Sequence, residues 1–217
     1  MKQTDSQTNK PLNKLTLTDR LRVRTAVIID PIVTFLAKYH LSPDTLTVVG
    51  MLSHFFLAYL IAISEMRWAG IAMIFLAPLD ALDGALARKL GRKQGGFGAF
   101  LDSTLDRLAE IILFGGFIYY YLQIGDVGML GVSYVAITGS LMVSYTRSKA
   151  ESLHFSAKVG IMSRVERYVL MLVFLILDYP GIAVGILAVF TYVTVGQRMY
   201  HVWHQCYRTP DEGGEAS

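Results

Sequence analysis

Long apolar segments recur along the chain and are separated by short polar ones. A helix that crosses a bilayer needs roughly 20 predominantly apolar residues. Six segments approach that length, and they cover residues 46–64, 68–87, 97–121, 128–145, 168–179 and 181–200. The fifth is short and follows a charged, amphipathic stretch. The pattern therefore predicts an all-α, polytopic membrane protein with six transmembrane helices.

The segment before the first span has a different pattern. Residues 18–41 combine three arginines with an apolar face, as in a helix that lies on a membrane surface. Ser42, Pro43 and Asp44 follow, and they suit the N-cap, the first position and the first turn of a new helix. An interfacial amphipathic helix is therefore expected before the first transmembrane helix.

The composition agrees with a membrane protein, because 53% of the residues are hydrophobic and the mean hydropathy is +0.43. We expect one membrane domain over residues 17–208, between a mobile N-terminal segment (1–16) and a flexible C-terminal tail (209–217). The single cysteine, Cys206, excludes an intrachain disulfide and a cysteine metal site.

Lysine and arginine gather before the first predicted span and in every second loop after it. These cations are Lys10, Lys14, Arg20, Arg22, Arg24, Arg88, Lys89, Arg92, Lys93, Arg147, Lys149, Lys158, Arg164, Arg167, Arg198 and Arg208. The alternate loops carry only Arg67, or Asp126 and Asp178 without a cation. Because cations in short loops remain on the cytoplasmic side, we expect a protein of the cytoplasmic membrane with both termini in the cytoplasm. Its partners would include membrane lipids and no nucleic acid.

Four aspartates interrupt the second and third predicted spans. Asp80 and Asp83 are three residues apart, and Asp102 and Asp106 are four apart, so each pair lies on one face of its helix. The intervening sequence "RKLGRKQGGFG" is basic and rich in glycine, which suits a cytoplasmic turn between antiparallel helices. The two pairs should therefore lie at similar depth near the cytoplasmic side.

Four carboxylates that converge in a membrane repel one another unless protons or cations intervene. Oxygen ligands without histidine or cysteine favour magnesium, manganese or calcium, and magnesium is usually held together with substrate phosphates. Magnesium is the expected ion, with manganese as the alternative. Gly84 and Gly98 flank the acid pairs and leave room for a ligand near the backbone. Buried ion pairs with Arg88 or Arg107 are the structural alternative.

The stretches "DALDGALAR" and "GAFLDSTLD" together resemble the signature of the CDP-alcohol phosphotransferase family, DxxDGxxAR followed by GxxxDxxxD. All eight fixed letters are present, namely Asp80, Asp83, Gly84, Ala87, Arg88, Gly98, Asp102 and Asp106. Nine residues separate Arg88 from Gly98, whereas the usual family pattern has one fewer. The additional residue falls in the glycine-rich turn.

The resemblance implies a homodimer of six-helix protomers, each with a polar cavity that opens to the cytoplasm. It also implies the reaction, in which an alcohol attacks the β-phosphorus of a CDP-linked lipid such as CDP-diacylglycerol and CMP is released. By this resemblance Asp80, Asp83 and Asp102 bind the divalent cation. Asp106 joins this metal-binding set and is the catalytic general base. The residues implied to contact the CDP moiety are Gly84, Ala87, Arg88, Gly98 and Thr47.

A second basic stretch follows the fourth predicted span, on the side of the membrane where the aspartates are expected. Its cations are Arg147, Lys149, Lys158, Arg164 and Arg167. They either remain at the membrane surface or bind the phosphate of a phosphorylated polyol acceptor. "RSKAE", Gly160 and "RVER" resemble the phosphatidylinositol phosphate synthase branch of the family, although a lysine replaces an arginine at Lys149. This branch implies an inositol phosphate acceptor, with glycerol 3-phosphate as the alternative.

Two other classes of membrane protein also use intramembrane carboxylates. An intramembrane prenyltransferase binds magnesium diphosphate, but it would need more helices and two well-separated acidic motifs. A cation transporter would not require the glycine and arginine positions that accompany the aspartates. Both classes remain alternatives, and the favoured interpretation is a transferase that releases CMP.

Overall fold

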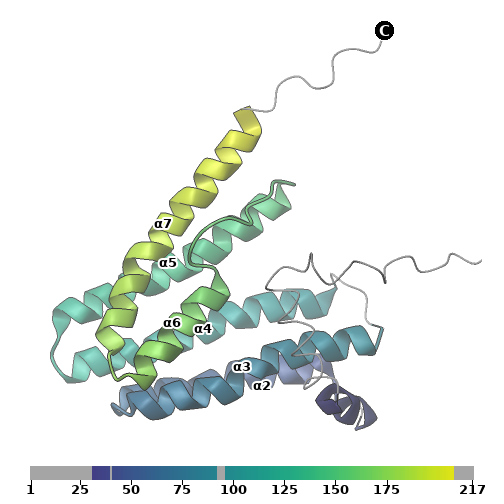
Figure 1. Cartoon of the computed structure of the whole chain (residues 1–217), viewed down its shortest axis with the longest axis horizontal. Coiled ribbons are helices and arrows are strands. Elements are labelled where there is room, and N and C mark those ends of the chain that lie inside the picture. The colour runs from purple at the N-terminus through teal and green to yellow at the C-terminus, as the bar shows by residue number, and fades with distance from the viewer. Residues whose placement is uncertain (1–30, 40, 92–95, 208–217) are drawn as a thin grey trace, which may run out of the picture.

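The computed structural model describes residues 31–39, 41–91 and 96–207, apart from the side chains of residues 80 and 81. Within these ranges every regular element is a helix (Figure 1). Residues 31–38 form a short helix. The elements that follow are α2 (Pro43–Ala62), α3 (Met66–Lys89), α4 (Phe97–Gln123), α5 (Val127–Ser152), α6 (Arg164–Ile176) and α7 (Pro180–Tyr207).

Each of the six predicted apolar segments coincides with one helix from α2 to α7, which confirms the all-α class. Of the predicted interfacial helix, residues 31–38 are helical. Residues 18–30 lie outside the described ranges, as do the terminal segments 1–16 and 209–217 and most of the glycine-rich turn.

Within the described ranges, four helices are long and apolar enough to cross a membrane, namely α2, α3, α5 and α7. α4 has 27 residues but carries four charged side chains in its first half, and charges are costly in the bilayer core. α6 has 13 residues, or about 20 Å of helix, whereas the hydrocarbon core is about 30 Å thick. The chain is thus a multi-pass membrane protein, and length and composition support four of the six predicted spans.

α2 packs against both α3 and α4. Gly116 of α4 allows one of these contacts, because a Cβ atom there would lie 2.6 Å from the carbonyl oxygen of Ala58 on α2. α3 and α4 follow one another in the chain, yet they are not among the helix pairs that pack extensively. The two aspartate-bearing helices are therefore positioned mainly through their separate contacts with α2.

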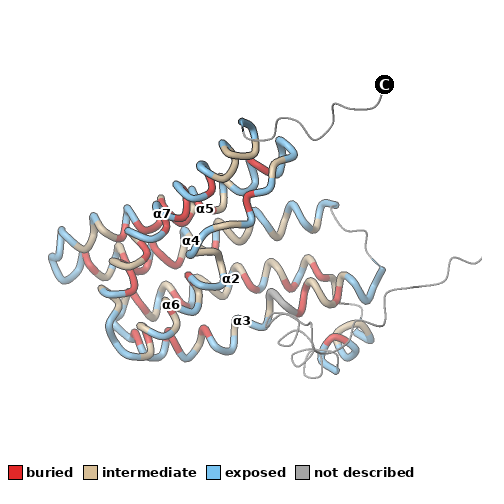
Figure 2. The backbone as a smooth tube through the Cα atoms, turned by 45° about the horizontal axis from the view of Figure 1, so that its top comes forward, coloured by how far each residue is buried: buried red, intermediate tan, exposed pale blue. Residues whose placement is uncertain are grey.

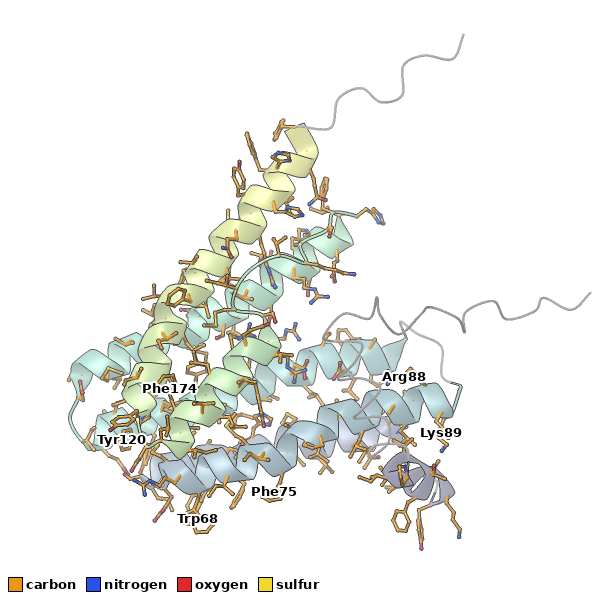
Figure 3. The ribbon with its side chains drawn as sticks, viewed as in Figure 1. Trp68, Phe75, Arg88, Lys89, Tyr120 and Phe174 are labelled. Carbon is orange, nitrogen blue, oxygen red and sulfur yellow. The ribbon has the colours of Figure 1, made fainter. Side chains whose placement is uncertain are left out.

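The remaining helices complete the bundle, since α5 packs against α4 and α7, and α6 packs against α3 and α7. The buried apolar core includes Leu57, Phe114, Phe117, Leu175 and Leu187. Buried residues lie along the inward faces of the helices, and exposed ones cover the outside (Figure 2). Trp68 and Phe75 point away from the bundle (Figure 3) and are 62% and 75% exposed. Such an outer face is suited to contact with lipid.

Candidate active site

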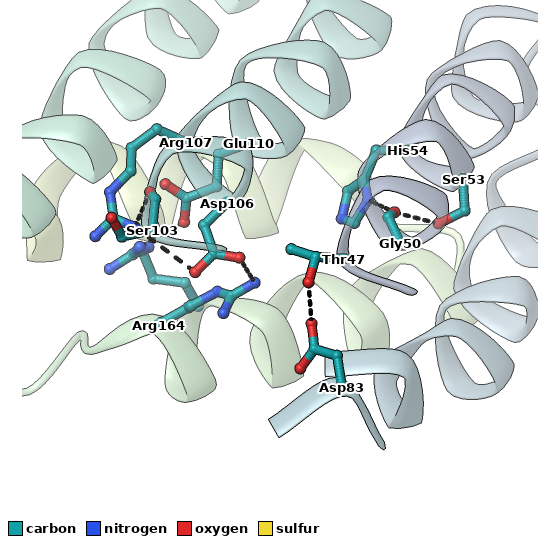
Figure 4. A network of polar contacts seen from close by, with 11 residues as sticks. Thr47, Gly50, Ser53, His54, Asp83, Ser103, Asp106, Arg107, Glu110 and Arg164 are labelled. Carbon is teal, nitrogen blue, oxygen red and sulfur yellow. Dashed lines mark hydrogen bonds and ion pairs between the residues drawn. The ribbon is translucent and has the colours of Figure 1, made fainter. Parts of the chain in front are cut away.

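The first turns of α2 connect the two aspartate-bearing helices. The Thr47 hydroxyl lies 2.7 Å from Asp83 Oδ2 on α3 (Figure 4). It also lies 3.1 Å from the carbonyl oxygen of Pro43. Asp83 is 8% exposed, and a buried carboxylate is costly without hydrogen-bond partners. Thr47 therefore holds one oxygen of Asp83 in a fixed position.

The same end of α2 approaches the start of α4. A Cβ atom at Gly98 would lie 3.3 Å from Asp44 Oδ1, which is closer than ordinary van der Waals contact. Glycine at position 98 thus allows a further carboxylate to lie beside α4. The sequence placed Asp44 in the first turn of this helix, and the structure brings its carboxylate beside the start of α4.

Asp106 lies on α4, one turn after Asp102 and on the same face. Its side chain is 13% exposed, and Asp106 Oδ1 lies 2.6 Å from Arg164 Nη2 on α6 (Figure 4). Arg107 Nη1 lies 3.6 Å from the other carboxylate oxygen. Two guanidinium groups thus neutralise the carboxylate that the family resemblance marks as the general base.

A second ion pair joins the same two helices one turn further along. Glu110 on α4 accepts a hydrogen bond from Nη2 of Arg167 on α6. The Arg167 side chain is 2% exposed, and its Nη1 donates to the carbonyl oxygen of Met162 at 3.2 Å. α4 and α6 are not among the helix pairs that pack extensively. Their connection near the site therefore depends on these long side chains.

Glu110 was not identified from the sequence, although it continues the spacing of four residues set by Asp102 and Asp106. The three residues lie on one face of α4. The matching cations, Arg164 and Arg167, are three residues apart on α6. This paired spacing was the available signal, but it does not say which cation meets which acid.

Three of the residues implied to contact the CDP moiety, Gly84, Ala87 and Arg88, lie toward the C-terminal end of α3. Arg88 is exposed and lies at this end with Lys89 (Figure 3). Its Nη1 is 3.5 Å from the position that a Cβ atom on Gly84 would occupy. Ala87 and Gly84 are partly exposed. Small residues therefore lie beside an exposed guanidinium, and this arrangement suits a bound phosphate or ring.

The five cations of the second basic stretch lie in different surroundings. Arg147 is exposed and pairs with Glu151 at 2.9 Å. Lys149 at the end of α5 and Lys158 in the α5–α6 loop are exposed. Arg164 meets Asp106, and Arg167 is buried against Glu110. Only the first four are therefore accessible enough to meet a ligand from solution.

The predicted metal ligands can be compared with the donor chemistry that the structure shows. Asp83 and Asp106 are carboxylates with little exposure, and oxygen donors of this kind suit a hard divalent cation. Among the described side chains, no three acidic, histidine or cysteine groups lie close enough together to hold a metal ion. The side chain of Asp80 lies outside this description. The carboxylate oxygens of Asp83 and Asp106 are thus ligand atoms of the kind that magnesium or manganese binds.

The model of the CDP-alcohol phosphatidyltransferase family matches residues 40–196. This range contains the whole aspartate signature and the second basic stretch. The chain therefore belongs to the CDP-alcohol phosphatidyltransferase family, and it is a transferase of that type. The resemblance drawn from "DALDGALAR" and "GAFLDSTLD" is confirmed.

Similar proteins include an archaetidylinositol phosphate synthase of Pyrococcus horikoshii, 36% identical over 167 residues, which are 76% of this chain and 85% of the relative. A phosphatidylinositol phosphate synthase of Cutibacterium acnes is 36% identical over 157 residues, which are 71% of this chain and 75% of the relative. The fold resembles a crystal structure of Mycobacterium tuberculosis phosphatidylinositol phosphate synthase with CDP-DAG bound. The TM-score is 0.77 at 25% identity, with coverage of 88% of this chain and 99% of the other.

A second crystal structure of the mycobacterial protein contains manganese and citrate. Its TM-score with this chain is 0.75, at 24% identity, with coverage of 87% of this chain and 93% of the other. This likeness concerns the fold.

Proposed function

We propose that this protein transfers the phosphatidyl group of CDP-diacylglycerol, or of a similar CDP-linked lipid, to a hydroxyl of inositol phosphate and releases CMP. The names of its relatives and the signature support this reaction. The observation that carries the proposal is the 2.6 Å contact between Asp106 and Arg164. It joins the general base of the resemblance to a cation from the stretch that the resemblance assigns to the acceptor phosphate.

In the proposed site, Asp80, Asp83 and Asp102 hold the divalent cation together with Asp106. When bound, this ion, magnesium or manganese, neutralises charge on the donor diphosphate and on the departing CMP. Thr47 keeps Asp83 oriented toward the site through its 2.7 Å hydrogen bond. Gly84, Ala87, Arg88 and Gly98 leave space for the CDP moiety and place a guanidinium beside it.

The chemical step involves one bond made and one bond broken. The acceptor hydroxyl oxygen attacks the β-phosphorus of the donor, and the bond from that phosphorus to CMP breaks. The hydroxyl proton passes to Asp106, and CMP leaves with the electron pair of the broken bond. A general base of this kind contributes about 10²–10⁴-fold to the rate.

Arg164 connects recognition of the acceptor with the base. One nitrogen of its guanidinium holds Asp106, and the group has five N–H donors in a planar fork. Because the Arg164 side chain is 41% exposed, we also assign it to contact with the phosphate of the acceptor. Arg147, Lys149 and Lys158 supply further positive charge. Arg167 is buried in its pair with Glu110, so we assign it a positioning role instead of phosphate binding.

The proposed enzyme resides in the cytoplasmic membrane with six transmembrane helices, both termini in the cytoplasm and the site on the cytoplasmic side. The alternation of cations supports this orientation. α4 and α6 would then complete the six spans, with the charges of α4 near the membrane surface. A homodimer is proposed on the basis of the family resemblance alone.

The test is CMP release by purified protein in detergent with CDP-diacylglycerol and magnesium. Separate reactions contain inositol phosphate, glycerol 3-phosphate or free inositol, and a parallel set contains EDTA. We expect release that requires inositol phosphate and disappears with EDTA. If the enzyme prefers glycerol 3-phosphate, the proposed acceptor is wrong, but the proposed type of reaction stands. Release that does not depend on any alcohol would refute the proposal.

A further inference from the structure

α3 contains a proline directly before the first aspartate pair. Pro78 lies inside the helix, two residues before Asp80. Because proline has no backbone N–H, the carbonyl oxygen of Ile74 receives no hydrogen bond from the residue one turn later. A helix bends most easily at such a gap. α3 therefore consists of a first half, residues 66–77, and a second half, residues 79–89.

The two halves of α3 pack into different apolar clusters. Met66 and Met73 of the first half belong to the main buried core. Leu82 and Leu86 of the second half belong to a smaller cluster, which they share with residues of α2 and of the short helix before it. The main core therefore fixes only the first half. The second half bears the groups that we assign to the divalent cation and the CDP moiety.

α6 holds the first half of α3 at the turn before the proline. The two helices pack closely (Figure 1), since a Cβ atom at Gly70 would lie 2.8 Å from the backbone nitrogen of Ile176. The Tyr168 hydroxyl on α6 donates a hydrogen bond to the carbonyl oxygen of Met73 at 2.7 Å. Met73 precedes Pro78 by five residues. A polar group from a neighbouring helix thus stabilises the backbone where proline interrupts it.

The same face of α6 also contacts the second aspartate-bearing helix. Tyr168 follows Arg164 by four residues, so the two side chains share one face of α6. Arg164 Nη2 lies 2.6 Å from Asp106 Oδ1 on α4. Because α3 and α4 are not among the helix pairs that pack extensively, α6 is a second connection between them besides α2. It relates the position of the gap in α3 to that of Asp106.

We propose that Tyr168 is a positioning residue for the cation-binding half of α3, and this inference rests on the proposed function. By holding the turn before Pro78 against α6, its hydroxyl limits the movement of the second half about the gap. Asp83 is thereby kept at the distance from the carboxylates of α4 at which one divalent cation contacts both helices. Such a site tolerates changes of only about 0.2 Å in its ligand distances. Tyr168 acts through the backbone of α3.

The first test measures the movement of α3 and does not depend on activity. Tyr168→Phe removes the hydroxyl and keeps the ring. In hydrogen exchange of the purified protein in detergent, read by mass spectrometry, we expect the amides of residues 79–89 to exchange about fivefold faster, because one hydrogen bond is lost. The amides of α5 should not change. The matched control is Tyr192→Phe, which removes a hydroxyl 3.0 Å from Thr138 on α5 and should leave exchange in α3 unchanged.

A double-mutant comparison tests the role of the gap. Pro78→Ala restores the missing N–H, so the backbone of α3 no longer depends on α6 at this turn. In this background, Tyr168→Phe should change exchange of residues 79–89 by less than about twofold. A fivefold effect in both backgrounds would mean that Tyr168 acts independently of the gap, and it would overturn the proposed mechanism.

The second test measures cation binding. Mn²⁺ is titrated into the purified protein without lipid donor, and the electron paramagnetic resonance signal of the free ion gives the dissociation constant. We expect Tyr168→Phe to weaken Mn²⁺ binding about threefold, whereas Tyr192→Phe should leave it unchanged. In the assay of CMP release, Tyr168→Phe should raise the magnesium concentration that gives the half-maximal rate and leave the KM for inositol phosphate unchanged.

The outcomes separate this inference from the proposed function. If the wild-type protein binds no Mn²⁺ and CMP release needs no divalent cation, the proposed function fails and this inference fails with it. If the wild type binds Mn²⁺ and Tyr168→Phe binds it equally well, only the positioning role is overturned. Unchanged exchange in residues 79–89 would also overturn it. Equal acceleration in α3 and α5 would mean a general loss of stability and would have the same consequence.

Discussion

Glu110→Gln is expected to destabilise the protein substantially, because it removes the negative partner of a buried cation. Arg167 is 2% exposed, and the Glu110 side chain is 15% exposed. Glutamine has nearly the same shape as glutamate and can still accept a hydrogen bond, so the change mainly removes the charge. Arg167 would then remain as an uncompensated charge inside the helix bundle.

The size of the effect follows from that burial. Breaking a buried ion pair by neutralising one partner costs about 3–5 kcal/mol. For a chain of this length, 1 kcal/mol changes Tm by roughly 2–4 °C. The expected decrease in Tm is therefore roughly 6–20 °C, which thermal unfolding of the purified protein in detergent can measure by intrinsic fluorescence.

The chain offers a matched control in a second pair between arginine and glutamate. Arg147 and Glu151 are 2.9 Å apart, but each side chain is 47% exposed. Exposed pairs contribute about 0–1 kcal/mol, so Glu151→Gln should change Tm by less than about 4 °C. Both variants carry the same chemical change, and the difference between them isolates the effect of burial.

The double variant Glu110→Leu with Arg167→Met removes both charges and should recover most of the stability, since apolar replacements of similar volume are often neutral. The reasoning would be refuted if Glu110→Gln and Glu151→Gln had equal effects. It would also be refuted if the double variant lost as much stability as the two single variants together.

Three further variants test the proposed site. Asp106→Asn should retain much of the cation and donor binding while CMP release falls by about 10²–10⁴-fold; unimpaired turnover would remove Asp106 from the role of base. Arg164→Ala should weaken acceptor binding and leave donor binding intact in a titration with CDP-diacylglycerol, and equal loss of both would reassign it. Thr47→Val keeps the side-chain shape but leaves Asp83 without its 2.7 Å partner, so donor affinity should fall about tenfold, or about 1.4 kcal/mol; unchanged affinity would contradict the orienting role.

The positions of the helices could be predicted from the sequence because the signal is local. Apolar segments of nearly spanning length, such as 46–64 and 181–200, became helices α2 and α7. The spacing of Asp102 and Asp106 placed them on one face for the same reason, since helical periodicity relates residues within a single turn. The family signature is also a local pattern, and it was sufficient to identify the reaction class.

The number of membrane spans was less determined by the sequence. Hydrophobicity predicted six, whereas α4 and α6 do not reach the length and apolar character that would identify a span by itself. α4 is stabilised by contacts with α2 and α5, and α6 by contacts with α3 and α7. The positions of α4 and α6 are therefore set by packing against neighbouring helices, and their own amino-acid composition does not determine them.

The partners of the charged residues were decided by the tertiary structure. Arg167 was expected to be a phosphate ligand like Arg164, yet it is buried against Glu110, which lies 57 residues earlier in the chain. The bonds between Gln205 and Ser156 span 49 residues. Apolar helix faces resemble one another in sequence, so only the packing of complete helices determines which faces meet. The sequence by itself therefore determined the helices, the acid pairs and the reaction class, while packing decided which cation pairs with which acid.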